Sequence, residues 1–351
     1  MIPVKNIYYM LAYVFQILNE DGFKNVAVEQ FDNVAELCAA ILVKGVSLQL
    51  KRGLAREYIP ETEALAGIRG RMDITESIKT RTMIRKRMVC TYDEFSVNTY
   101  MNRIIKTTMG QLLHADISKS KKKEIRRLLV FFSEVQELEI HSINWKQQYS
   151  RNNQMYRLMI SICYLVLKGL LQTTADGSIR LMQFVDEHRM CDLYEKFIRE
   201  YYRQEFPEIK TGGSWISWQL DDGFGDMLPM MKTDIMLSYQ ERILIIDAKY
   251  YEYTTQSQYD KCTVHSANLY QIFSYVKNKE YELKDDPHEV SGMLLYAGTD
   301  EEIQPDQKYR MSGNRISVRT LDLNQDFSMI REQLDGIVRE YFGEAAEFSK
   351  R

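Results

Sequence analysis

The sequence predicts an α/β fold in its C-terminal half, preceded by a mixed helical and β N-terminal half. Two apolar, β-prone runs, 232–237 and 243–249, lie on either side of the polar break 239–242. Apolar residues recur at helical spacing before this pair, at 191–202, and after it, at 269–276. Strands flanked by helices in this order are typical of an α/β core.

The N-terminal half is expected to alternate between helices and a small β region. Apolar residues recur at helical spacing in most of it, whereas 51–90 has short alternating segments with glycines. The expected order is a helix at 4–19, a helix at 31–50, the β region at 51–90, helix over 99–140 with a break near 116–118, and a helix at about 154–171.

The C-terminal half contains the remaining expected elements. In order they are the helix around 195, strands at 215–220, 233–239 and 243–250, the helix around 271, strands at 292–297 and 315–321, and a closing helix at 328–342. We predict two domains, 1–150 and 151–351.

Composition limits the class of protein. The 351 residues are 27% charged and 45% hydrophobic, which is typical of a globular protein, and the net charge of −3 argues against a generally basic DNA-coating protein. A nucleic-acid contact therefore needs a local patch, for which 79–87 and 119–127 are candidates. For 119–127 the alternative is a plain solvated helix face.

Other site classes are not indicated. The five cysteines are far apart, without a Cys-x-x-Cys pair or a Cys/His cluster, so neither zinc nor a disulfide framework is expected and a reducing cytoplasm fits. The longest apolar stretch, 159–171, contains Ser161, Lys168 and Gly169 and falls short of a membrane span. No P-loop motif is present, so the chain is not expected to be a P-loop NTPase.

The paired runs carry two aspartates and a lysine. A hairpin loop centred between Gln240 and Glu241 places Asp234 directly opposite Asp247 on one face of the sheet. Lys249 is two residues past Asp247 and shares that face. Two like charges on neighbouring strands destabilise a sheet unless they are neutralised, and a divalent cation that prefers oxygen ligands does this. The alternative is an ordinary buried hairpin with a chance Asp and Lys at its end.

Asp234, Asp247, Ala248 and Lys249 resemble the PD-(D/E)xK nuclease signature. In this sequence Thr233 stands where that superfamily usually has a proline, and the nearest proline is Pro229. The resemblance implies a magnesium-dependent phosphodiesterase, with manganese as an alternative cofactor. Asp234, Asp247 and the Ala248 carbonyl would bind the metal, and Lys249 would orient or activate the attacking water.

Two flanking helices extend the resemblance. Gln271 and Tyr275 are four residues apart on the helix after the Asp-x-Lys strand, as in the RecB-like branch of the superfamily. Glu195 borders the apolar stripe of the preceding helix, where many of these nucleases supply a further metal-binding carboxylate. The alternatives are a solvated charge for Glu195 and ordinary helix packing for Gln271 and Tyr275.

The N-terminal half resembles the McrC family, the nuclease subunits of McrBC-type restriction systems for modified DNA. The similar segments are 2–13, 67–74, 90–99 and 102–106. Together with the nuclease motif, the resemblance runs from residue 2 to about 276. Each motif is short, and their order along one chain carries the specificity.

The resemblance implies a Mg-dependent DNA endonuclease subunit that cleaves methylcytosine-containing double-stranded DNA. Its N-terminal domain would dock on a McrB-like AAA+ GTPase ring, which binds GTP and whose hydrolysis it stimulates. Arg69 and Arg71 are candidates for that contact. Two alternatives stay open: a non-catalytic GTPase activator or scaffold with a vestigial nuclease fold, and a stand-alone RecB-like repair nuclease.

Overall fold

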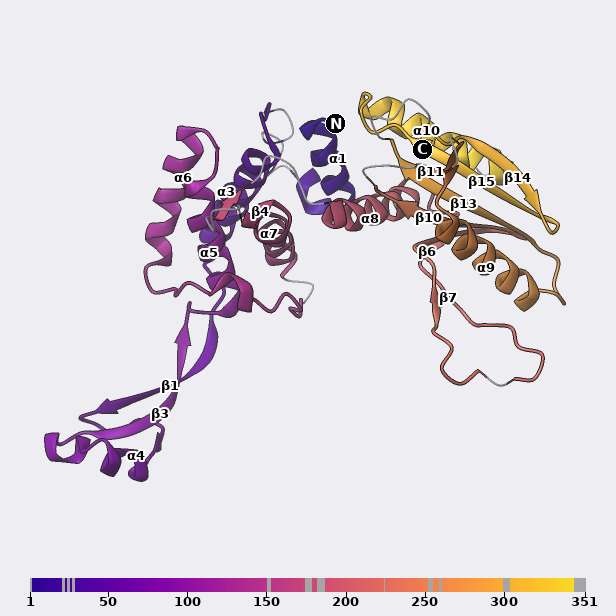
Figure 1. The fold of residues 1–351 in the computed structure, drawn as a ribbon. Helices are drawn as coiled ribbons and strands as arrows, with labels where there is room; N and C mark the ends of the chain where they lie inside the picture. The colour runs from indigo at the N-terminus through magenta and orange to yellow at the C-terminus, as the bar shows by residue number, and fades with distance from the viewer. Residues whose placement is uncertain are drawn as a thin grey trace. The chain divides into compact units, whose positions relative to one another are not determined.

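The computed structural model describes most of the chain, and its contacts divide it into two compact units (Figure 1). Unit 1 comprises Met1–Val34 and Phe184–Arg351, and unit 2 comprises Ala35–Gln183. The described residues are 2–20, 23, 26, 29–149, 153–173, 179–181, 187–223, 225–251, 255–258, 261–298 and 304–343.

The helices follow the predicted positions closely. They are α1 (Val4–Val14), α3 (Val34–Arg52), α4 (Ile74–Lys79), α5 (Tyr100–His114), α6 (Lys119–Leu129), α7 (Gln154–Tyr164), α8 (Glu187–Glu205), α9 (Ser266–Glu282) and α10 (Phe327–Phe342). The predicted break near 116–118 is confirmed, because α5 and α6 are separate helices. The helix expected to reach 171 is α-helical only to Tyr164 and continues as a π-helix over Leu165–Leu170.

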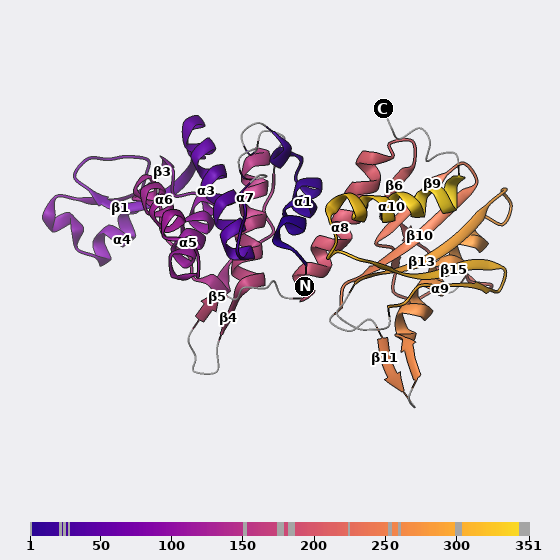
Figure 2. The same cartoon turned by 90° about the horizontal axis from the view of Figure 1, so that it is seen from above.

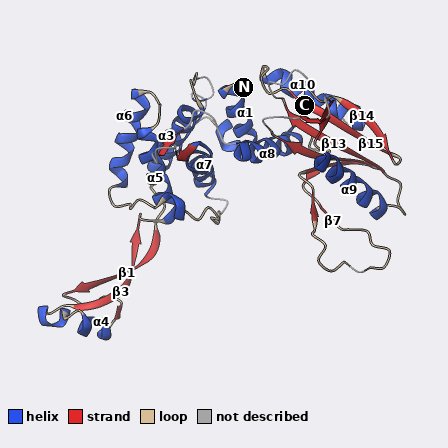
Figure 3. Cartoon of the chain, viewed as in Figure 1, coloured by secondary structure: helices blue, strands red, loops and turns tan. Residues whose placement is uncertain are grey.

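The strands fall into one large sheet and several small ones (Figure 3). They are β1 (Glu57–Leu65), β2 (Arg71–Met72), β3 (Met88–Ser96), β4 (Leu171–Thr173), β5 (Ile179–Leu181), β6 (Lys210–Gly212), β7 (Trp215–Ile216), β8 (Met231–Lys232), β9 (Ile235–Tyr239), β10 (Arg242–Lys249), β11 (Thr255–Gln258), β12 (Lys261–Val264), β13 (Glu289–Ala297), β14 (Gln307–Met311) and β15 (Asn314–Leu321). The strand expected at 215–220 is only the two-residue β7, and the edge strands β6 and β14 were not predicted.

Unit 1 is built on a six-stranded mixed sheet with the order β14-β15-β13-β10-β9-β6. The central strands β10, β13 and β15 are parallel, and the flanking pairs are antiparallel. The parallel step from β10 to β13 passes through α9, as a crossover connection requires. The predicted mixed α/β architecture is therefore found in this half of the chain.

Helices cover both faces of this sheet (Figures 1 and 2). On one face Ile272, Tyr275 and Val276 of α9 pack on Ile245 of β10 and Leu294 of β13. Gly292 permits the close approach of α9, because a Cβ there would lie 2.8 Å from Val276 Cγ2. On the other face α8 and α10 lie together, with the Tyr202 hydroxyl donating to the Leu334 carbonyl.

The first helix belongs to unit 1, which differs from the predicted division into 1–150 and 151–351. The Tyr9 ring stacks on Phe327 at 4.5 Å, and the Tyr13 hydroxyl donates to Glu205 Oε1 at 2.6 Å. The Asn6 side-chain amide donates to the carbonyls of Leu323 and Gln325, each at 2.8 Å. The apolar face of α1 is thus buried on α8 and α10, and the predicted boundary at 150–151 itself lies outside the described residues.

Unit 2 consists of helices α3, α5, α6 and α7, from which β1 and β3 extend as a long antiparallel ribbon (Figure 3). Buried Asn102 holds the base of the ribbon. Its amide donates to the carbonyls of Ala55 and Val97, and its oxygen accepts from the Tyr156 hydroxyl at 2.7 Å. The buried amide of Asn102, with three partners, therefore fixes the ribbon to α5 and α7.

Two further features of the described residues concern membrane spans and cysteines. No helix among them has both the length and the apolar character needed to cross a bilayer. Cys38, Cys90, Cys163 and Cys191 are free thiols, and the side chain of Cys262 lies outside the described residues.

Candidate active site

The hairpin of β9 and β10 has the predicted register. Ile235 pairs with Ile246 and Tyr239 with Arg242, so the turn is centred between Gln240 and Glu241. Gln240 has a φ of 53°, and this left-handed residue forms the tight turn that the sequence did not mark with glycine. At this end the last paired residues are Ile235 and Ile246, so Asp234 lies directly before β9 and Asp247 lies next to Ile246, near the carboxyl end of β10. The carboxyl ends of strands are where α/β sheets commonly place their sites.

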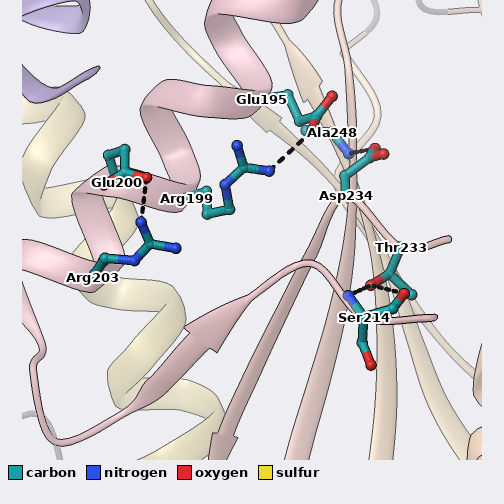
Figure 4. Close-up of polar contacts among 8 residues, drawn as sticks. All are labelled: Glu195, Arg199, Glu200, Arg203, Ser214, Thr233, Asp234 and Ala248. Atoms are coloured by element: carbon teal, nitrogen blue, oxygen red, sulfur yellow. Dashed lines mark hydrogen bonds and ion pairs between the residues drawn. The ribbon is translucent and has the colours of Figure 1, made fainter. Parts of the chain in front are cut away.

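Asp234 and Asp247 are neighbours at this end of the sheet. Asp234 Oδ2 accepts the backbone N–H of Ala248 at 3.1 Å (Figure 4). Asp247 is buried with only 1% of its side chain exposed. Burial raises the pKa of Asp247 to about 7, Lys249 opposes this rise, and the charge of Asp234 adds to it. The two carboxylates therefore interact electrostatically, as the register predicts.

Lys249 connects the acidic pair to α9. Its Nζ lies 2.8 Å from Asp247 Oδ2 and donates to Gln271 Oε1 at 3.3 Å. Gln271 Nε2 donates to the Tyr275 hydroxyl at 2.8 Å, and that hydroxyl donates to the Lys232 carbonyl at 3.0 Å. Burial alone would lower the pKa of Lys249, but Asp247 and Asp234 raise it. The ammonium is therefore held charged and oriented by residues from two elements.

Glu195 lies on α8 beside Asp234 and Ala248 (Figure 4). Its Oε1 is 3.3 Å from Arg199 Nη1, an ion pair one helical turn along α8. Burial raises the pKa of Glu195, the charge of Asp234 raises it further, and Arg199 lowers it. Glu195 is thus close enough to sense Asp234, but its described partner is a cation of its own helix.

Thr233, at the position where the superfamily usually has proline, has a hydrogen-bonding role that proline could not fill. Its N–H donates to the Ser214 carbonyl at 2.9 Å, and its Oγ1 accepts the Ser214 N–H at 2.9 Å (Figure 4). Proline lacks the N–H. Thr233 therefore ties the segment before β7 to the segment that carries Asp234, directly before β9.

The oxygen atoms of Asp234, Asp247 and Ala248 could supply some of the ligands of a hard divalent cation. Both carboxylate oxygens of Asp247 are buried, and neither accepts a hydrogen bond of good geometry from the described residues. The Lys249 ammonium, 2.8 Å from Asp247 Oδ2, supplies one positive charge for the two carboxylates of Asp234 and Asp247, so a divalent cation would complete the neutralisation. The described residues contain no ready cluster of three His, Cys, Asp or Glu side chains around one point. Asp234 and Asp247 would therefore hold the cation together with oxygens such as the Ala248 carbonyl and water.

Sequence reasoning missed a second polar network beside Lys249. Tyr296 is the ladder partner of Lys249 on β13, and its hydroxyl accepts from Asn268 Nδ2 at 2.9 Å. Asn268 Oδ1 in turn accepts from the Tyr251 hydroxyl at 3.4 Å. Asn268 lies three residues before Gln271, on the same side of α9. That spacing was the one available signal, whereas the position of Tyr296 depends on the parallel pairing of β10 with β13.

The two arginines predicted for partner contact differ in their surroundings. The Arg69 guanidinium lies 3.9 Å from the Tyr92 ring centroid and 2.6 Å from Glu94 Oε2. Arg71 is exposed on β2. Gly70 between them has a φ of 68°, and a Cβ there would meet the Thr91 carbonyl at 2.4 Å, so this turn requires glycine.

We expect magnesium to stabilise the protein more at about pH 8 than at about pH 6. The pKa of Asp247 is raised to about 7 from 3.8. A group with a raised native pKa contributes stability below its unfolded pKa, and this stability is lost as the pH rises through the native value. Without metal, ionisation of Asp247 therefore lowers the free energy of unfolding as the pH rises from about 6 to about 8. Because the ionised carboxylate is the form that binds Mg²⁺, magnesium should stabilise the protein more at the higher pH.

Thermal unfolding with and without Mg²⁺ at both pH values measures this effect. Saturation at 10–100 times the Kd corresponds to about 1–3 kcal/mol of stabilisation near pH 8. In Asp247→Asn the Mg²⁺ response should be small at both pH values. Equal Mg²⁺ stabilisation of the variant and the parent protein would contradict the role of Asp247.

Comparisons with known proteins agree on one family. A family model described as McrBC 5-methylcytosine restriction system component matches residues 4–297. A curated relative, Type IV methyl-directed restriction enzyme EcoKMcrBC of Escherichia coli (strain K12), is 31% identical over 347 residues, which cover 97% of this chain and 98% of the relative.

Two solved structures are also similar. One is a half-complex from the tetradecameric assembly of Thermococcus gammatolerans McrB AAA+ hexamers with bound McrC. It has a TM-score of 0.49 and 16% identity, and the match covers 94% of this chain and 76% of that chain. The other is the McrBC complex of the same organism, with a TM-score of 0.38, 15% identity and 58% of each chain covered.

Proposed function

The chain belongs to the McrC family of McrBC 5-methylcytosine restriction system components, and from this premise we propose that it is the Mg-dependent endonuclease subunit of such a system. Its substrate is double-stranded DNA that contains methylcytosine. The cleavage chemistry belongs to a PD-(D/E)xK core formed by the sheet of unit 1 with α8 and α9.

One observation carries the nuclease proposal. Asp234, Asp247 and Lys249 meet at the carboxyl end of β10, with Lys249 Nζ 2.8 Å from Asp247 Oδ2. Asp247 is buried with a second carboxylate, Asp234, and a single ammonium, Lys249, beside it, which is a costly arrangement for side chains that only serve packing. Two acids and a lysine at one strand end are the groups that metal-assisted phosphodiester hydrolysis uses.

Each residue has a distinct role in this proposal. Asp234 and Asp247 bind magnesium, which when bound polarises the scissile phosphate and makes water a better nucleophile. Lys249 orients the attacking water and stabilises the negative charge that develops on the phosphate oxygens. Gln271 holds the Lys249 ammonium in place by accepting its hydrogen bond, and Tyr275 holds Gln271 by accepting a hydrogen bond from its amide.

Glu195 is proposed as a third carboxylate, acting through its proximity to Asp234. Its ion pair with Arg199 must open for direct metal contact. Arg199 would then be free to meet a DNA phosphate, since guanidinium groups bind phosphate well.

We further propose a division of labour with a McrB-like AAA+ GTPase ring. The curated relative is a methyl-directed restriction enzyme, and the Thermococcus gammatolerans assembly contains McrC bound to McrB hexamers. In this chain the β1–β3 ribbon of unit 2 carries exposed Ile68, Ile78 and Ile84, which suit a protein partner. The partner binds GTP, and this chain stimulates its hydrolysis.

Cleavage of matched DNA substrates tests the proposal. The purified chain is incubated with methylcytosine-containing or unmodified duplex DNA, with and without its AAA+ partner, GTP and Mg²⁺. We expect double-strand cuts only with methylated DNA, partner, GTP and Mg²⁺ together. Stimulated GTP hydrolysis with intact DNA under all these conditions would instead support a non-catalytic activator. Cleavage without the partner, at any methylation state, would support a stand-alone nuclease.

A further inference from the structure

One face of α6 carries an exceptional density of positive charge. Its eleven residues include six lysines and arginines and one glutamate. Ile125 and Leu128 are buried, and α6 packs on α5 through this side. At about 100° per residue, five cations lie on the opposite side of the helix. We call this set the α6 patch: Lys119, Lys122, Lys123, Arg126 and Arg127.

The α6 patch is exposed and has no neutralising partner within the described part of the chain. Lys119, Lys123, Arg126 and Arg127 are exposed, and Lys122 is half-buried. None of the five side chains forms an ion pair or hydrogen bond with another described residue. Two other exposed cations, Arg203 and Arg339, instead pair with carboxylates of their own helices.

The order of charges along α6 also works against the helix. A helix N-terminus carries partial positive charge and favours acidic residues. The first turn of α6 has none, and Lys119, Lys121 and Lys122 stand there instead, after the N-cap Ser118. Local choices that oppose the fold are expected mainly at functional positions. Glu36 Oε1 accepts the Ser118 N–H at 3.3 Å, so a carboxylate of α3 already meets this helix end. The side-chain cations of the α6 patch are therefore what attracts an anion.

We propose that the α6 patch binds the phosphate backbone of duplex DNA without reading its sequence. This rests on the proposed function, which makes duplex DNA the substrate. The helix is about 16 Å long, and a duplex carries one negative charge per ~1.7 Å, so about nine phosphates lie within its length. Because the whole chain has a net charge of −3, DNA contact needs such a local surface.

The salt dependence of DNA binding tests this. The full-length chain is titrated with an unmethylated duplex of about 30 base pairs in EDTA, which prevents cleavage, over a series of salt concentrations. Lys123→Ala/Arg126→Ala/Arg127→Ala removes three cations. We expect the slope of log K against log salt to fall in magnitude by about 3, and binding at low salt to weaken at least about tenfold.

A matched variant controls for net charge. Lys51→Ala/Arg52→Ala/Lys210→Ala removes three exposed cations elsewhere, and its slope should equal that of the parent protein. An unchanged slope in the α6 variant, or equal losses in both variants, would overturn the proposal. So would intact DNA binding with lost association to the AAA+ partner, which would mean that an acidic protein covers α6 and the exposed Val130 and Phe131.

This readout is independent of catalysis. Because binding is measured in EDTA, a chain that cuts no DNA can still show the change in slope. DNA binding by the α6 patch can therefore be confirmed even if the nuclease proposal fails. Conversely, normal cleavage of methylated DNA with an unchanged slope would reject the α6 patch alone.

Discussion

Asp247→Asn should lower Mg-dependent DNA cleavage by at least about 10³-fold. The substitution keeps the shape of the side chain but removes a buried carboxylate that lies beside Asp234 and 2.8 Å from the Lys249 ammonium. Metal binding weakens because a neutral amide is a poorer ligand than a carboxylate. Cleavage of methylated DNA by the complex with its AAA+ partner is the measurement.

The same variant should keep its association with the partner and its GTPase stimulation, because Asp247 lies in unit 1, whereas the β1–β3 ribbon proposed to meet the partner belongs to unit 2. Asp221→Asn, on the exposed loop between β7 and β8, is the matched control and should cut normally. Cleavage at the parental rate by Asp247→Asn would remove the acidic pair from the mechanism, whatever family the chain belongs to.

Lys249→Met should reduce the cleavage rate by about 10²–10³-fold while leaving Mg²⁺ binding in place at high pH. The Lys249 side chain is 14% exposed, and its ammonium is held between Asp247 and Gln271. Its loss therefore removes an oriented positive charge from beside the reacting phosphate. Without this counter-charge the pKa of Asp247 should rise further. Single-turnover cleavage at saturating Mg²⁺ and about pH 8.5 therefore separates lost chemistry from lost metal.

Two variants make this result specific. Lys210→Met, on the edge strand β6 of the same sheet, should retain the parental rate. Gln271→Ala should fall between Lys249→Met and the parent protein, because it removes one support of the ammonium and leaves the ammonium itself. A Lys249→Met protein that cuts normally at saturating Mg²⁺ would reject the Asp-x-Lys interpretation.

The sequence by itself determined the local elements and the relation of Asp234, Asp247 and Lys249. Apolar, β-prone runs predicted β9 and β10, and helical spacing predicted α8 and α9. The hairpin register was inferred from chemistry, because only this pairing places both acids and Lys249 together, and a one-residue slip would turn one acid to the other face of the sheet. The observed pairing of Ile235 with Ile246 has that register.

Only the tertiary structure decided which elements share a core and what surrounds the acids. The apolar face of α1 is compatible with any apolar surface, and its burial on Phe327 and Phe197 depends on α8 and α10 lying side by side. Tyr296 pairs with Lys249 across two parallel strands that are far apart in the sequence, which no local pattern encodes. The physical reason is that periodicity fixes the face that a segment buries, whereas the partner of that face is chosen by competition among all apolar surfaces of the folded chain.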